Sequence, residues 1–277
     1  MLKSRVITAS LLLPIIIALI WFLPSVTFSM VMALIACLGL WEWSGLAGFK
    51  KTFWIQVGGG ALVFFTGFLI LSILQAFGPN VLKYGLPTLI IIFWLIALIS
   101  LYRFPKDNKI WKMKVVSVVT GSFLLGPTWF ALVILKDLAP NPVFPHGGQW
   151  VLYVLSLIWV ADIAAYFVGK RFGKHKLAPK ISPGKTWEGA YGALIASVLV
   201  IVIGYLLLHP TMNPLKWFLI GLVTVASSIV GDLFESSFKR MRNVKDSGKI
   251  LPGHGGILDR IDSVMAAVPI FTILVSL

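Results

Sequence analysis

Carboxylates and cations are most concentrated in one short stretch near the C-terminus. It begins at Lys245, ends at Asp262 and contains Asp246, Asp259 and Arg260 between them. Mg²⁺ prefers hard oxygen ligands, usually one or two carboxylates together with substrate phosphates. Lysine and arginine bind phosphate by charge, and arginine can also grip it with two parallel hydrogen bonds. The stretch therefore predicts metal-assisted phosphate chemistry, with all three aspartates as candidate Mg²⁺ ligands, rather than a cysteine and histidine zinc site.

Glycines surround a single histidine within this stretch, in the order Gly253, His254, Gly255 and Gly256. Because glycine lacks a side chain, its backbone can approach a ligand closely. A lone loop histidine more often forms hydrogen bonds than binds metal. We therefore expect His254, Gly255 and Gly256 to contact substrate, with metal binding by His254 as the alternative.

A polar stripe precedes this stretch inside an apolar run. If the run is helical, one face carries Ser228, Asp232, Glu235, Ser236 and Lys239. Such a stripe has to face protein or a water-filled cavity. Two carboxylates and a lysine suit a metal that bridges phosphates, so Asp232 is predicted to bind metal, although simple ion pairing is the alternative. We expect Ser237 to contact substrate and Lys239 and Arg240 to bind its phosphates.

A second candidate anion site lies upstream in the sequence S-P-G-K-T-W-E-G, which begins at Ser182. Its G-K-T resembles the end of a P-loop, but Pro179 stands where that motif needs glycine. A glycine turn before an expected helix, with Lys185 and Thr186 in the first helical turn, still offers free N–H groups and a cation to an anion. We expect Ser182, Lys185, Thr186 and Glu188 to bind substrate. A plain loop with a solvated lysine is the alternative.

A lone carboxylate, Asp162, lies inside another apolar run. A charge there is costly unless it meets a cation, a metal or water, and function is the default interpretation. Tyr166 lies one helical turn later on the same face and could orient the carboxylate. We expect Asp162 to contact substrate. The alternatives are a structural pair with a lysine of a neighbouring helix, or a protonated aspartic acid.

Membrane helices are the elements that have to position these residues. Of the 277 residues, 58% are hydrophobic and only 12% are charged, whereas soluble domains average about 25% charged residues. Apolar runs lie at residues 6–23, 26–47, 53–76, 85–102, 115–135, 149–168, 187–208, 214–236 and 262–277. We expect an all-α polytopic membrane protein of about nine transmembrane helices, the first of them uncleaved. It would form a single membrane domain over residues 1–277, with N-terminal helices in 1–148 and a catalytic half in 149–277.

The net charge of +14 follows from membrane topology and needs no nucleic-acid partner. With the N-terminus inside, only Lys83, Lys136 and Lys216 fall on the outer side, which leaves 21 of the 24 lysines and arginines inside. Cytoplasmic loops of membrane proteins carry such an excess. We therefore expect a multi-pass protein of the cell (inner) membrane. Its N-terminus and active site would face the cytoplasm, and its C-terminus would lie outside.

The C-terminal stretch also carries a resemblance. From Ser237 to Asp262 the chain reads S-F-K-R, four residues, and then K-D-S-G-K-I-L-P-G-H-G-G-I-L-D-R-I-D. This resembles, without departure, the signature of the phosphatidate cytidylyltransferases, also called CDP-diacylglycerol synthases. D-I-A-A-Y-F-V-G-K and S-P-G-K-T-W-E-G are similar to that family as well. The resemblance implies that CTP and phosphatidate give CDP-diacylglycerol and pyrophosphate, with Mg²⁺ as cofactor and a homodimer as the assembly.

Two other functions compete with this one. A CDP-alcohol phosphotransferase would carry a D-G-x-x-A-R…G…D…D spacing, which this chain lacks. A membrane transporter of an anionic substrate could use Asp162 and Lys185 along its path, but it predicts two pseudo-symmetric halves. The two halves of this chain differ in chemistry, which favours the enzyme.

Overall fold

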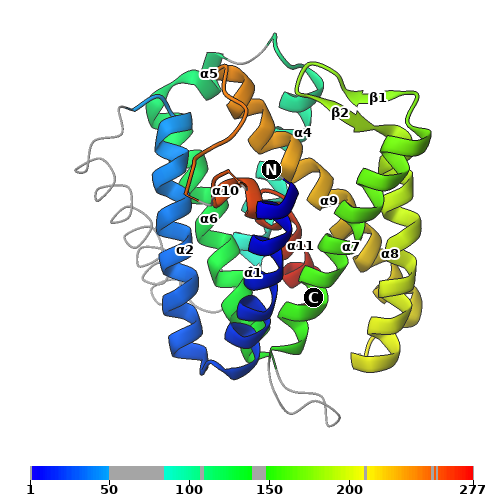
Figure 1. Ribbon diagram of the computed structural model, residues 1–277. Helices are drawn as coiled ribbons and strands as arrows, with labels where there is room; N and C mark the ends of the chain where they lie inside the picture. Colours follow the sequence, from blue (N-terminus) through cyan, green and yellow to red (C-terminus); the bar gives the residue numbers. More distant parts are fainter. Residues whose placement is uncertain are drawn as a thin grey trace.

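The apolar runs of the sequence fold into long helices that run side by side (Figure 1). The computed structural model describes residues 2–49, 84–106, 109–138, 148–208, 211–250, 253 and 255–276. The elements are α1 (Leu2–Phe22), α2 (Ser25–Leu46), α4 (Leu86–Tyr102), α5 (Lys109–Lys112), α6 (Lys114–Asp137), α7 (Gln149–Phe172), β1 (Lys176–Ala178), β2 (Ser182–Thr186), α8 (Trp187–Leu208), α9 (Pro214–Met241), α10 (Leu258–Ile261) and α11 (Val264–Ser276).

Five of these helices, α2, α6, α7, α8 and α9, are long and apolar enough to cross a membrane. Helix α4 and residues 12–22 of α1 are shorter apolar helices. The chain is therefore a multi-pass, almost entirely helical membrane protein, as its hydropathy predicts. The count of about nine spans stays a prediction. Run 53–76 lies outside the described residues, and the last run forms α11, which has only 13 residues.

A small antiparallel hairpin joins α7 to α8. Its strands β1 and β2 pair with Lys176 opposite Thr186. The prediction that Lys185 and Thr186 form the first turn of a helix is wrong, because pairing with β1 keeps the chain extended up to Thr186 and α8 begins at Trp187. Thr186 caps that helix instead. Its Oγ1 accepts a hydrogen bond from Gly189 N at 3.1 Å, which satisfies one of the N–H groups that a helix start leaves unpaired.

Helices α7 and α8 pack closely along their length. A Cβ atom at Gly189 would lie 2.8 Å from the carbonyl oxygen of Ala165, and one at Gly192 would lie 2.6 Å from the side chain of Val168. Small residues let helix backbones approach in this way inside membranes. The close approach fixes α7, which carries Asp162, against the hairpin and the start of α8.

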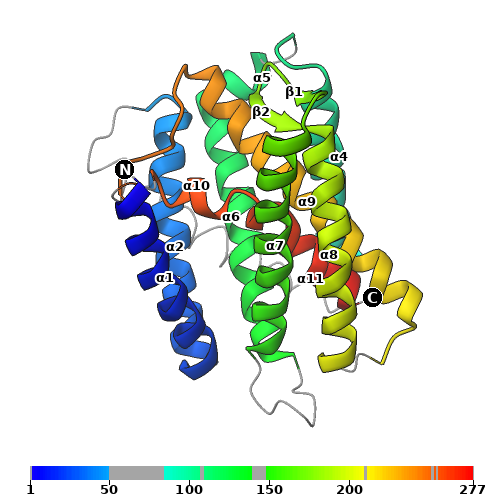
Figure 2. The same ribbon diagram turned by 45° about the vertical axis from the view of Figure 1, so that its right-hand side comes forward.

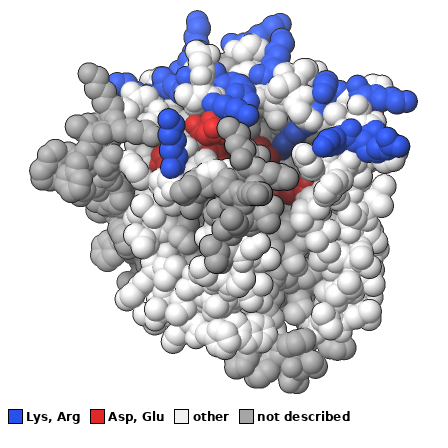
Figure 3. Space-filling view, viewed as in Figure 1, with Lys and Arg blue, Asp and Glu red and all other residues white. Residues whose placement is uncertain are grey.

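Lysines and arginines of the visible face gather at one end of the bundle, with carboxylates just below them (Figure 3). Helix α9 ends on that side with Lys239 and Arg240. Lys136 and Lys216 lie at the opposite end, near the last residue of α6 and the first of α9. Lys136 and Lys216, which the sequence predicts on the outer side, are therefore separated in space from the basic end. Lys83 lies outside the described part of the chain.

The chain that follows α9 leads back into the bundle. Helix α10 lies near mid-height, well below the basic end, and α11 continues from it toward the far end (Figures 1 and 2). A Cβ atom at Gly231 of α9 would lie 2.7 Å from the carbonyl oxygen of Asp262. Close contact with α9 thus places Asp259 and Asp262 inside the bundle. In the sequence they follow the last basic residues of α9 by only about 20 positions.

Candidate active site

The described residues 246–250 and 255–262, which lead back into the bundle after α9, are called the re-entrant segment, and Asp259 organises it. Its carboxylate accepts hydrogen bonds from Ser247 N at 3.0 Å and Gly256 N at 2.8 Å, and from Lys239 Nζ at 2.8 Å. Burial alone raises the pKa of Asp259, but the lysine and the backbone donors outweigh it and hold the pKa below its usual value. Gly255 has φ +83°, and a Cβ atom there would lie 2.7 Å from Asp259 Oδ2. Only glycine therefore fits this turn comfortably.

Lys239 ties α9 to this segment. It forms ion pairs with Asp259 and with Glu235, one helical turn earlier. The side chain of Glu235 is completely buried and that of Lys239 is 8% exposed. The prediction that the polar stripe of α9 faces protein or a water-filled cavity is confirmed for these two residues, which face protein. Removal of one partner from such a buried pair leaves an uncompensated charge and costs about 3–5 kcal/mol.

Three further carboxylates meet between α7, α9 and α10. Asp232 pairs with Lys185 of the hairpin at 2.7 Å. Asp162 accepts a hydrogen bond from Ser263 Oγ at 3.4 Å and interacts electrostatically with Asp232 and Lys185. Asp262 likewise interacts with both of them. Residues that are far apart in sequence thus form one cluster, which we call the carboxylate–lysine cluster: Asp162, Lys185, Asp232 and Asp262.

The hairpin that carries Lys185 is held from two sides. Glu188 accepts hydrogen bonds from the backbone N–H groups of Lys174 and His175, and its Oε1 lies 2.7 Å from His175 Nδ1. Arg240 Nε donates to the carbonyl of Ile181 at 2.8 Å. In this structure Glu188 and Arg240, both predicted to contact substrate, therefore position the lysine.

Glu42 of α2 is a site residue that sequence reasoning missed. It is 1% exposed and accepts hydrogen bonds from Leu258 N at 2.9 Å and Ser247 Oγ at 3.2 Å. Gly248 and Gly256 lie so close to its carboxylate that a side chain at either would collide with it. The signal was present, because Glu42 is a lone carboxylate in an apolar run and such residues are functional by default.

Two predicted phosphate-binding cations remain available. Lys245 and Arg260 have exposed side chains that form no ion pair or side-chain hydrogen bond with another described residue. Lys245 and Asp246 line a cavity of about 670 Å³ at the basic end, together with Trp41 of α2. Pockets of about 300–1,000 Å³ accommodate small-molecule ligands.

The remaining predicted residues have separate positions. Ser237 Oγ donates to the carbonyl of Phe234, one turn earlier in α9, at 2.7 Å. Ser182 lies half-buried in β2, while Gly255 and Gly256 belong to the turn around Asp259. His254 lies outside the described residues.

The oxygen-rich cluster fits Mg²⁺ better than a metal that needs a complete protein cage. Among the residues that the structure describes, no three histidine, cysteine or acidic side chains form a ready-made metal site. Mg²⁺ keeps several waters and usually binds one or two carboxylates plus substrate phosphates. Asp232 and Asp262 supply such a pair, and Ser236 Oγ donates to Asp232 Oδ1 at 3.2 Å.

Together, the fold and the cluster define a multi-pass membrane protein with carboxylates and a lysine gathered between its helices. The model of the cytidylyltransferase family matches residues 3–277, so the chain belongs to that family of nucleotidyltransferases. A phosphatidate cytidylyltransferase of Pseudomonas aeruginosa is 39% identical over 275 residues, which cover 99% of this chain and 97% of the relative. One of Haemophilus influenzae is 36% identical over 286 residues and 98% of each chain. One of Staphylococcus epidermidis is 47% identical over 132 residues, about half of each chain.

Proposed function

We propose that this enzyme transfers the cytidylyl group of CTP to phosphatidate, which gives CDP-diacylglycerol and pyrophosphate. The names of the two full-length relatives support this reaction. The observation that carries it is the carboxylate–lysine cluster, in which Lys185 of the hairpin at the basic end (Figure 1) pairs with Asp232 of the membrane helix α9. A water-soluble nucleotide and a lipid headgroup can both reach such a position.

The chemistry demands charge stabilisation more than proton transfer. A phosphate oxygen of phosphatidate attacks the α-phosphorus of CTP, and the bond from that phosphorus to the β-phosphate oxygen breaks. The attacking oxygen is already ionised at neutral pH, so no strong general base is needed. The barrier comes from repulsion between two polyanions and from charge that grows on the leaving pyrophosphate. Cationic side chains aimed at that charge lower the barrier.

Lys245 and Arg260 suit the role of phosphate clamps, because neither is engaged by the described part of the chain. Lys185 is the third proposed phosphate-binding cation, and it would leave its ion pair with Asp232 to bind a phosphate. Lys239, Arg240 and Asp259 then hold the hairpin and the re-entrant segment in place. We propose that the base and ribose of CTP enter the cavity beside Trp41, whose ring offers a surface for stacking.

Mg²⁺ is the proposed cofactor, with Asp232 and Asp262 as its protein ligands and Asp162 beside them. When bound there, the ion would offset negative charge on the phosphates of CTP. Asp246 faces the nucleotide cavity, where it could bind a second ion. His254, Gly255 and Gly256 are proposed to contact substrate.

We further propose that the basic end faces the cytoplasm of the inner membrane, with the N-terminus on the same side, because positive residues mark cytoplasmic loops. The proposed assembly is a homodimer without nucleic acid.

The test is an assay of purified protein with CTP, phosphatidate and Mg²⁺. Pyrophosphate and CDP-diacylglycerol should form in equal amounts, and omission of any one component should stop both. Movement of anions across proteoliposomes without CDP-diacylglycerol formation would instead decide for the transporter.

A further inference from the structure

An apolar cavity of about 180 Å³ begins at Arg260. Its walls come from α1, α2, α6, α7 and the α10–α11 junction, and Arg260 is the charged residue among the described residues that line it. Two polar side chains of the wall form hydrogen bonds with the backbone rather than facing the cavity unpaired. Thr128 Oγ1 donates to the carbonyl of Leu124 at 2.7 Å, and Trp129 Nε1 donates to that of Ser29 at 3.0 Å. A molecule bound in the cavity would therefore meet hydrocarbon side chains along most of its length and Arg260 at one end.

The cavity also has a direction. Arg260 of α10 lines it near the mid-height of the bundle. Ile20 near the end of α1 and Phe28 near the start of α2 line it at the end of the bundle opposite the basic end. A lipid whose phosphate lies at Arg260 would extend an acyl chain from there toward the far end of the bundle. The shape and the charge thus fit an amphiphile with an anionic head.

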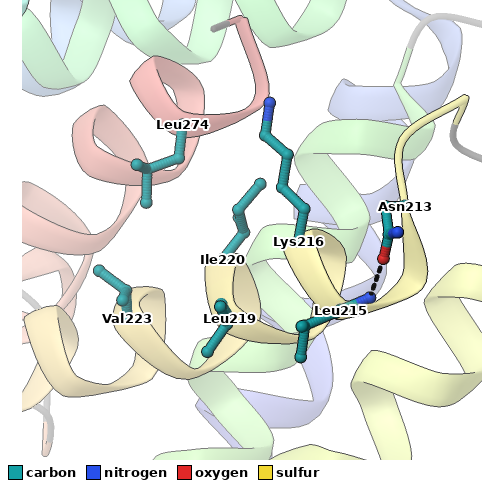
Figure 4. Close-up of a pocket in the computed structure, with 7 residues that line it drawn as sticks. All are labelled: Asn213, Leu215, Lys216, Leu219, Ile220, Val223 and Leu274. Carbon is teal, nitrogen blue, oxygen red and sulfur yellow. Dashed lines mark hydrogen bonds between the residues drawn. The ribbon is translucent and has the colours of Figure 1, made fainter.

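Two other apolar cavities offer a comparison. One of about 450 Å³ is lined by Lys216 and by apolar side chains of α9 and α11 (Figure 4), but it lies at the far end of the bundle. The other, of about 360 Å³, includes Ala226 and shares Val223 and Leu274 with the first. Neither cavity is lined by a described residue of the carboxylate–lysine cluster or of the re-entrant segment. A lipid bound in the first cavity would be remote from the reaction, and the second has no cation among its described lining residues to bind a lipid phosphate.

We propose that the cavity below Arg260 is an acyl groove, which holds part of one acyl chain of phosphatidate while Arg260 binds the lipid phosphate. This inference rests on the proposed function and adds to it the site of the lipid tail. A chain in the bilayer is already in an apolar medium, so the groove gains little by transfer from water. Its value is positional, because it fixes where the attacking phosphate lies relative to CTP.

The first test fills the groove and compares two substrates. Ala36 of α2 lines the groove, and Ala36→Leu would occupy part of it. The specificity constant kcat/KM is measured with dioleoyl phosphatidate and with dibutyryl phosphatidate, whose chains are too short to fill the groove. Ala226→Leu in the second cavity is the matched control. Met32→Phe provides a second filling variant should Ala36→Leu not fold.

The groove predicts a selective loss. Filling it should lower kcat/KM for dioleoyl phosphatidate by about tenfold or more, which is the effect of one methylene in an apolar pocket. The rate with dibutyryl phosphatidate should stay unchanged, and Ala226→Leu should affect neither substrate. Equal losses for both substrates, or no loss with either, would overturn the assignment.

A second measurement does not depend on turnover. Phosphatidate with a diazirine in its acyl chain should label peptides of α1, α2 or α7 after illumination, and excess unlabelled phosphatidate should suppress the labelling. Labelling confined to α4, α9 and α11 would refute the groove even in an active enzyme. Wild-type protein that forms no CDP-diacylglycerol would refute the proposed function instead, so the two failures are distinguishable.

Discussion

Replacement of Glu42 tests whether the N-terminal half builds the active site. Glu42→Ala would leave two buried donors, Leu258 N and Ser247 Oγ, without their acceptor. Each buried unsatisfied donor costs about 1–3 kcal/mol, so the expected loss of stability is about 2–6 kcal/mol. The re-entrant segment would also shift relative to α9. Misplacement by about 1 Å can lower a rate by about a hundredfold.

The assay combines pyrophosphate release with thermal unfolding of the purified protein. Glu42→Gln is the control, because it keeps the shape and one acceptor oxygen but removes the charge. Hydrogen bonds to charged groups exceed neutral ones by about 1 kcal/mol, so this variant should lose less stability and retain more activity. Ser247→Ala completes a double-mutant cycle, in which residues in contact show coupling of about 0.5–3 kcal/mol. Wild-type stability and turnover in Glu42→Ala would refute the reasoning.

Three further predictions concern metal, phosphate and topology. Asp232→Asn should lower turnover by at least about a hundredfold with normal membrane insertion, and an unchanged Mg²⁺ titration would point to a purely structural aspartate. Arg260→Lys should lower kcat/KM by about tenfold if the guanidinium grips phosphate with two hydrogen bonds, since lysine is only a point charge; equal rates would remove that role. In a Cys37→Ser background, Ala178→Cys should react with impermeant thiol reagents only from the cytoplasmic side and Met212→Cys only from outside. Labelling of position 178 from outside would reverse the topology.

Hydropathy alone determined where most helices lie. The predicted runs 115–135 and 187–208 correspond to α6, Lys114–Asp137, and α8, Trp187–Leu208. A helix in lipid satisfies its own backbone hydrogen bonds, so its position depends mainly on local composition. Helical periodicity is also a local property, and it predicted that Glu235 and Lys239 share one face of α9. The charge split of the chain was likewise readable before any packing was known.

The contacts that assemble the site were not readable in this way. The bond between Glu42 and Leu258 joins residues 216 positions apart, and the one between Asp162 and Ser263 spans 101 positions. Periodicity describes which face a residue shares with its neighbours along one helix. It carries no information about which helix that face will meet, which depends on the packing of the whole bundle.

The re-entrant segment shows most clearly which features follow from local sequence and which depend on packing. The sequence determined by itself that this stretch is rich in carboxylates, cations and glycines, and its resemblance to one family indicated the chemistry. Only the tertiary structure decided that Asp259 holds the segment together while Asp262 joins Asp232. That choice depends on the close approach of Gly231 to the α10–α11 junction, and on a buried carboxylate of α2 that accepts the backbone of Leu258. Both are long-range contacts, and their energy exists only once the helices have packed.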